Sequence, residues 1–280
     1  MSIDYVLHSH TFRCGHANKD IEDYVTKCIN NGYKIYGVSD HVFLPGVHCP
    51  TIRGDYSLLD EYINEFKRCK EIYGNTIEMR LGFECEHSVF FKKYYESLLK
   101  EKGFDYLICG QHLGYDENGE VYFYLNETRP DEEKGLLRYR DDLIDAMKSG
   151  LYLYIAHPDV CFVYARSVKP IYERIVKDIL DAAEKYNAVI EVNINGFSRQ
   201  KTYNGVTHLD YPCDYFWEQA SKRNVRIVVG GDFHNPDAID DKDLIKQTED
   251  FIKRHNLKLT SIDEVYDEYQ QRLKTNLKLK

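Results

Sequence analysis

Short apolar segments rich in β-branched and aromatic residues recur along the chain, and longer segments with the period of amphipathic helices separate them. Most of the apolar segments are continuous rather than alternating, which is typical of parallel strands that are buried on both faces. We therefore predict seven strands, at 4–7, 35–39, 78–83, 105–109, 152–156, 189–193 and 226–229.

Between these strands the apolar periodicity predicts helices, at 21–31, 58–73, 136–148 and 170–186. The alternation of strand and helix predicts an α/β fold with a parallel sheet, either open or closed into a barrel. No linker, internal repeat or low-complexity segment interrupts it, so we predict that residues 1–280 form one domain. From about residue 240 the chain is charged and helical in period, and it ends in a lysine-rich tail.

One segment, 114–133, breaks the alternation. It contains the sequence Asp-Glu-Asn-Gly, followed by alternating residues from Val121 to Leu125. This pattern predicts a hairpin inserted between a strand and the next helix, a place where loops usually shape substrate pockets.

Composition and charge narrow the class of protein. With 280 residues, 43% of them hydrophobic, the chain can bury a full-sized core. The net charge of -9 argues against nonspecific nucleic-acid binding, which requires a basic face. No segment reaches the roughly 18 apolar residues of a membrane helix, and the first 20 residues are polar, so we expect a cytoplasmic protein without membrane contact. The eight cysteines form no CxxC pair, which favours reduced thiols.

Potential metal ligands stand at the end of each predicted strand. The carboxyl ends of parallel barrel strands meet on one face, so residues distant in sequence would converge there. In chain order the strand-end residues are His8 and His10, Asp40 and His41, Glu84, His112, His157, Glu191 with Asn193 and Asn195, and Asp232 with His234.

The number of these histidines favours metal binding over a structural role. One histidine at a strand end is usually a hydrogen-bonded structural residue, but seven of the eleven histidines lie at or just past strand ends: 8, 10, 16, 41, 112, 157 and 234. Together with Glu84 and Asp232 they exceed the four ligands of one tetrahedral zinc, so more than one ion is implied. Imidazole with carboxylate suits Zn, Mn or Fe. Such a centre can clamp the oxygens of a phosphoryl group and attract an anionic substrate to an acidic protein.

Eight short motifs occur in a fixed order. They are HSHT at 8–11, CGHA at 14–17, SDH at 39–41, GFE at 82–84, GQH at 110–112, AHPD at 156–159, EVN at 191–193 and GDFH at 231–234. The ordered set resembles the polymerase and histidinol phosphatase (PHP) superfamily over about residues 2–235. The opening HSHTFRCGHA followed by VSDH resembles its histidinol-phosphatase branch.

This resemblance implies a distorted (β/α)7 TIM-like barrel with three metal ions at the C-terminal ends of its strands. It implies hydrolysis of a phosphate monoester, L-histidinol phosphate, in histidine biosynthesis, with a hydroxide attacking phosphorus in line. The ligands implied for the first ion are His8, His10, Glu84 and Asp232. Those for the second are Glu84, His112 and His157, and those for the third are His16, His41 and His234.

The resemblance also implies residues that contact the substrate. Arg166 and Arg199, the latter next to Ser198, stand where the family holds the substrate phosphate, and Arg13 is a further candidate. The planar fork of arginine fits phosphate. Asp232 or His234 could assist the departure of the alcohol. Asp40 could orient a neighbouring ligand or cap the following loop.

Three alternatives remain open at this point. The substrate could be another ester, such as a nucleotide, a sugar phosphate or a phosphotyrosine. An amidohydrolase barrel also opens with HxH, but it typically carries a metal-bridging lysine on a middle strand, where this chain has Gly-Gln-His. A non-catalytic metal-binding barrel would be favoured only if ligands were missing. The sequence leaves the metal identity and the oligomeric state open.

Overall fold

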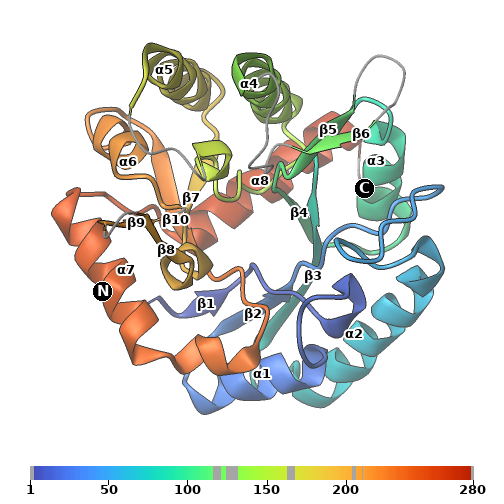
Figure 1. Cartoon of the computed structure of the whole chain (residues 1–280). Coiled ribbons are helices and arrows are strands. Elements are labelled where there is room, and N and C mark those ends of the chain that lie inside the picture. Colours follow the sequence, from blue (N-terminus) through green and yellow to red (C-terminus); the bar gives the residue numbers. More distant parts are fainter. Residues whose placement is uncertain are drawn as a thin grey trace.

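The computed structural model describes residues 3–115, 121–123, 132–162, 168–203, 206–209 and 211–278. Parallel strands line the centre of the molecule (Figure 1). Four of them pair in chain order: β1 (Tyr5–Val6), β2 (Ile35–Val38), β3 (Glu78–Cys85) and β4 (Tyr106–Cys109). A second parallel pair joins β7 (Val189–Asn193) to β10 (Arg226–Gly230).

Single-residue bridges connect the two groups of strands into a barrel. Ile155 bridges Cys109 on one side and Ile190 on the other, so it takes the fifth strand position. Ser9 bridges Phe233 and joins the end of β10 to the end of β1. The expected distorted (β/α)7 barrel is confirmed, but the strand expected at 152–156 is reduced to these bridges.

Helices surround the strands in a ring (Figure 1). The ring consists of α1 (Ile21–Asn30), α2 (Leu59–Tyr73), α3 (Lys92–Glu101), α4 (Glu132–Ser149), α5 (Pro170–Lys185), α6 (Asp214–Ala220) and α7 (Lys242–Arg254). Local chemistry sets some of their ends: Asp20 and Asp23 form a capping box at the start of α1, and Pro170 occupies the first turn of α5. Short 3-10 helices lie at Phe12–Cys14, Tyr56–Leu58, Val160–Phe162, Asn195–Ser198 and Pro236–Asp240.

Two antiparallel hairpins stand outside the barrel sheet. The hairpin of β5 (Leu113–Tyr115) and β6 (Val121–Phe123) confirms the insertion predicted in 114–133. A second hairpin, β8 (Gln200–Tyr203) with β9 (Val206–Leu209), was not predicted. The Asn-Gly pair at 204–205 is the sequence signal for it, because that dipeptide suits the tight turns of two-residue hairpins.

Tyrosine rings fill the inside of the barrel. The Tyr106 and Tyr154 hydroxyls both donate to the Leu7 carbonyl oxygen, at 2.9 and 3.2 Å. Gly37 and Gly82 leave room for the Tyr106 ring, since a Cβ on either glycine would approach its atoms to 2.5 Å. The interior is therefore a packed core, and any chemistry must occur at an end of the barrel.

Helix α8 (Ile262–Leu277) crosses behind the strands in Figure 1 and covers the end at which they begin. The Tyr269 hydroxyl donates to the Leu151 carbonyl at 3.0 Å and accepts from the Leu107 amide at 3.2 Å. The Arg272 guanidinium donates to the carbonyls of Gly150 and Tyr152. The opposite end, where the strands finish, is left for the functional site.

We expect Tyr269→Phe to lower the free energy of unfolding by about 1–3 kcal/mol, because it leaves two buried backbone groups without their partner. Urea denaturation measures this. Tyr266→Phe on the same helix keeps the ring that stacks on Arg80 and serves as the control. Equal stability of the two variants would contradict the role given to the Tyr269 hydroxyl.

None of the helices in the described part of the chain combines the length and the apolar character needed to cross a bilayer. The cytoplasmic location stays a prediction. One continuous set of buried hydrophobic side chains runs from Tyr5 to Leu277, which supports our proposal that the chain forms one domain.

Candidate metal centre

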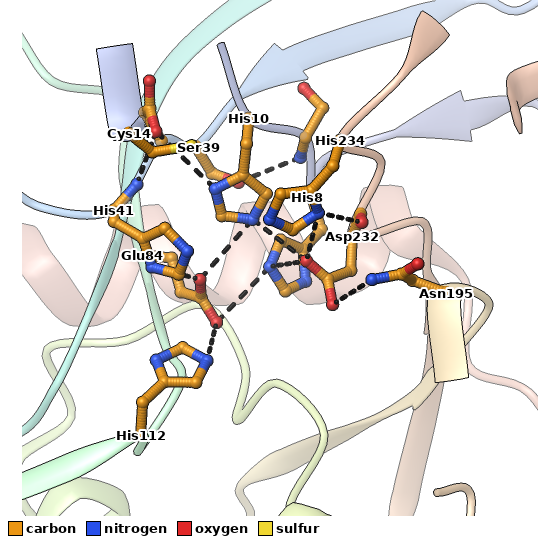
Figure 2. Close-up of polar contacts among 12 residues, drawn as sticks. His8, His10, Cys14, Ser39, His41, Glu84, His112, Asn195, Asp232 and His234 are labelled. Atoms are coloured by element: carbon orange, nitrogen blue, oxygen red, sulfur yellow. Dashed lines mark hydrogen bonds and ion pairs between the residues drawn. The ribbon is translucent and has the colours of Figure 1, made fainter. Parts of the chain in front are cut away.

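All nine predicted ligands gather at the C-terminal end of the barrel, on the loops that follow the strands or at the strand ends themselves. Figure 2 labels all of them except His16 and His157. Nitrogen, oxygen and sulfur atoms within 4.8 Å of one another form several overlapping groups of three. These groups are His8–His10–Glu84, His8–His157–Asp232, His41–Glu84–His112, His10–His41–His234 and Cys14–His16–His234.

The Glu84 carboxylate lies at the centre of the cluster and is 1% exposed. Its Oε1 is 2.8 Å from His157 Nε2, 3.4 Å from His8 Nε2 and 3.5 Å from His112 Nε2. Its Oε2 is 3.1 Å from His41 Nδ1 and 3.5 Å from His10 Nε2. Gly110 makes this position possible, because a Cβ there would lie 1.8 Å from Glu84 Oε1. Both oxygens of one carboxylate are thus shared among five imidazoles, as a bridging ligand requires.

Asp232 is the second buried acid of the cluster. Its Oδ1 lies 3.0 Å from His10 Nε2 and 3.5 Å from both His8 Nε2 and His234 Nδ1. Its Oδ2 accepts from the Asn195 amide at 3.2 Å. The backbone of Asp232 has a φ of 51°, a left-handed conformation that an aspartate adopts at some cost and that places its side chain.

His16 extends the cluster toward solvent. Its ring centre lies 4.8 Å from that of His234 and 5.2 Å from that of His41, and it is the one exposed residue among the nine. The structure thus brings together His16, His41 and His234. The buried Cys14 thiol also lies next to His16 and His234. The sequence had indicated no role for this cysteine.

Unpaired buried atoms within the cluster indicate that cations fit it. Among the described residues, His8 Nε2, His41 Nδ1 and Glu84 Oε2 are buried without a hydrogen-bond partner. Such atoms are costly unless a partner satisfies them. Imidazole nitrogens and carboxylate oxygens are ligands for divalent ions of the Zn, Mn and Fe type.

Three residues of the cluster have charge states that suit metal binding directly, whereas His8 and His10, whose pKa values the neighbouring carboxylates raise against the effect of burial, must each lose a proton when a metal binds. Burial, and then the positive charge of His10, lowers the pKa of His234 to about 3, and the same causes lower the pKa of His41 well below its ordinary value. Burial alone would raise the pKa of Glu84, yet the surrounding histidines, His112 first, hold it well below its usual range. At neutral pH His41 and His234 are therefore neutral and Glu84 is ionised, which are the forms that bind metal.

Glu191, in the middle of β7, contacts two of the predicted ligands. Its buried carboxylate accepts from His8 Nδ1 at 2.8 Å and from the His157 amide at 3.0 Å. The contact with Nδ1 leaves His8 Nε2 directed at Glu84 and Asp232. The sequence placed Glu191 at a strand end without showing this function.

We expect Glu191→Gln to weaken metal binding by about 10- to 100-fold, because the amide is a poorer acceptor for the His8 ring than the carboxylate. Competition with a metal-sensitive dye measures the affinity. Glu184→Gln, on the outer helix α5, is the control. Unchanged affinity in a folded Glu191→Gln protein would contradict the orienting role.

Asp40 is placed for both functions that the sequence left open. Its Oδ2 accepts from the Thr11 hydroxyl, and its Oδ1 accepts from the His41 amide at 2.9 Å. The same Oδ1 lies 3.6 Å from His10 Nδ1. Asp40 therefore fixes the loop after β2 and also faces His10, a predicted ligand.

The predicted substrate residues differ in their placement. The exposed Arg199 guanidinium lies 5.9 Å from the centre of the Tyr211 ring, which is itself 5.8 Å from the His157 ring, so the Tyr211 ring stands between Arg199 and the cluster. The Ser198 hydroxyl donates to the carbonyl oxygen of Asn195, whose amide reaches Asp232. Arg166 lies outside the described residues.

Arg13 is engaged within the protein. Its buried guanidinium pairs with Asp20 at 2.5 Å and with Glu61 at 3.0 Å, and it also donates to the Thr11 hydroxyl. These contacts support a role in holding the loop that carries Thr11, next to Asp40. Phosphate binding by Arg13 stays a prediction that its contacts do not favour.

The barrel and the cluster at its C-terminal end define a metal-dependent hydrolase of the (β/α)-barrel type. The chain belongs to the PHP domain family, whose sequence profile matches residues 6–195.

Two relatives and one solved structure are similar over most of the chain. A Deinococcus radiodurans protein named "Probable histidinol-phosphatase" is 26% identical over 235 residues, which are 82% of this chain and 85% of the relative. An Acetivibrio thermocellus protein named "Probable phosphatase" is 22% identical over 275 residues, 98% of this chain and 97% of the relative. The histidinol phosphate phosphatase of Lactococcus lactis, solved with zinc, L-histidinol and phosphate, superposes with a TM-score of 0.65 at 21% identity, covering 91% of this chain and 95% of the other.

Proposed function

We propose that this protein is a metal-dependent phosphomonoesterase that hydrolyses L-histidinol phosphate to L-histidinol and phosphate, a step of histidine biosynthesis. The observation that carries the proposal is the Glu84 carboxylate shared by five histidines at the mouth of a PHP barrel. The name of the Deinococcus relative and the ligands of the Lactococcus structure support the substrate.

The nine cluster residues would hold three divalent ions of the Zn, Mn or Fe type. We assign the ligand sets that the family resemblance implies, with Glu84 shared by two ions. The observed groups His8–His10–Glu84 and His41–Glu84–His112 support this sharing, as does the short contact of His157 with Glu84. When bound, such ions polarise phosphoryl oxygens and lower the pKa of water.

The remaining tasks fall to side chains of the protein. Arg199 would bind the substrate phosphate with its planar guanidinium, assisted by Ser198 and by Arg166. His234 or Asp232, neither of which carries an acidic proton at neutral pH, would take up the proton of the attacking water and pass it to the departing alcohol. The His234 side chain is 18% exposed and that of Asp232 6%, so His234 is the more accessible of the two.

Phosphate release from a panel of esters tests the substrate. Metal-replete protein is incubated with L-histidinol phosphate and, separately, with a nucleotide, a sugar phosphate and an aryl phosphate. We expect kcat/KM to be higher for L-histidinol phosphate by roughly tenfold or more. Equal or higher values for another ester would overturn the substrate assignment and leave a phosphatase of the same family.

One observation favours the alternative that another phosphate ester is the substrate. The Acetivibrio relative matches nearly the whole chain and is named only as a phosphatase. The alternative function is therefore hydrolysis of another small phosphate ester at the same centre.

A further inference from the structure

A buried ion pair lies directly behind one of the proposed ligands. Arg53, in the loop between β2 and α2, is 1% exposed, and its Nη2 donates to Glu86 Oε1 at 2.8 Å. Glu86 is also 1% exposed and is the first residue after β3, two residues beyond Glu84. The Glu86 Oε1 atom also lies 3.2 Å from Nδ1 of His112.

The geometry at His112 defines which nitrogen faces the centre. The Glu86 carboxylate is paired at 2.8 Å with the guanidinium of Arg53, which keeps its positive charge in proteins, so Glu86 acts as an acceptor. An ionised carboxylate can only accept, so the proton of the His112 ring lies on Nδ1. The other nitrogen, Nε2, is then a lone-pair donor, and it lies 3.5 Å from Glu84 Oε1.

A contribution to folding stability does not explain the buried ion pair of Arg53 and Glu86. Buried ion pairs contribute little net stability, since desolvation offsets the attraction between the charges. Here Arg53 Nε and Glu86 Oε2 are, in addition, buried without a hydrogen-bond partner among the described residues. An arrangement that costs stability is explained if Glu86 has another task, which is to accept a hydrogen bond from His112 and orient its ring.

We propose that Arg53 and Glu86 are positioning residues for the metal centre. Glu86 fixes the tautomer and the ring orientation of His112 so that Nε2 faces the ion shared with Glu84. Arg53 holds Glu86 in place and ties it to the β2–α2 loop through the Val42 carbonyl, to which its Nη1 donates at 3.1 Å. The inference deepens the proposed function and rests on it for the presence of the ion.

A pair of double variants separates positioning from folding. Removing Glu86 alone would leave the buried Arg53 charge unpaired and could unfold the protein. In Arg53→Met with Glu86→Leu, both charges are replaced by apolar groups and His112 loses its acceptor. In the matched control, Arg53→Met with Glu86→Gln, the charges are also gone, but the amide oxygen can still accept from Nδ1.

We expect the leucine variant to bind zinc about 100-fold more weakly than the wild type, measured by competition with a chelator, and the glutamine variant, whose amide oxygen is a weaker acceptor than the carboxylate, about 10-fold more weakly. Nitrogen chemical shifts of His112 in the metal-free proteins should show the Nδ1–H tautomer in the wild type and in the glutamine variant. They should show a mixture of tautomers in the leucine variant.

Folded leucine and glutamine variants with equal zinc affinity and the same His112 tautomer would overturn the inference. The tautomer is measured without metal or substrate. A wild-type protein that hydrolyses no ester would therefore refute the proposed function, whereas the inference about Glu86 and His112 would still be decided by the tautomer. Conversely, an active wild type whose His112 tautomer is unaffected by loss of Glu86 would leave the proposed function intact and end the inference.

Discussion

Glu84→Gln is expected to lower kcat/KM for ester hydrolysis by about 10³-fold or more. The substitution keeps the size of the side chain but removes the charge that both carboxylate oxygens share with five imidazoles. A bridging ligand supports the several kcal/mol of charge stabilisation that the ions contribute, and each 1.36 kcal/mol corresponds to about tenfold in rate. Steady-state phosphate release measures the effect.

The matched control is Glu78→Gln, at the opposite, exposed end of the same strand. It removes the partner of Arg80 but touches nothing at the mouth of the barrel, so its activity should equal that of the wild type. A folded Glu84→Gln protein that keeps a tenth of the wild-type rate would show that Glu84 does not hold the ions.

Chelation is expected to abolish activity and to lower the melting temperature together. Ions that bind only the folded state stabilise it by about 2.7 kcal/mol per site at a hundredfold excess over Kd. For a chain of this length the loss corresponds to roughly 5 °C or more in Tm. Activity assays and calorimetry, before and after dialysis against a chelator, measure both effects.

Adding back Zn, Mn or Fe should restore both properties, whereas Mg should not, because the cluster is rich in imidazole nitrogen. Glu84→Gln should show a smaller chelator effect on Tm than the wild type. Full activity after exhaustive chelation would refute a metal-dependent mechanism, whatever the change in Tm.

The positions of the nine cluster residues could be predicted from the sequence because two general features of parallel barrels act together. Apolar strands end where polar residues begin, and parallel strands bring those ends to one face of a barrel. His8, Glu84 and Asp232 are far apart in the chain but each stands at such an end. Their convergence did not depend on details of packing, which is why it could be predicted.

The supporting residues could not be predicted because their contacts depend on packing. Glu191 meets His8 across 183 positions, and Arg53 meets Glu86 across 33, and no spacing in the sequence indicates either pair. The fifth strand was overestimated for a related reason. The segment at 152–156 is as apolar as the other strands, but only Ile155 forms bridges to both neighbours.

Diffraction from crystals grown with metal, recorded on both sides of the zinc, manganese and iron absorption edges, tests the central claim most directly. The account predicts three anomalous peaks at the mouth of the barrel, two of them flanking the Glu84 carboxylate and the third among His16, His41 and His234. Anomalous peaks confined to other parts of the protein, with none beside Glu84, would contradict it.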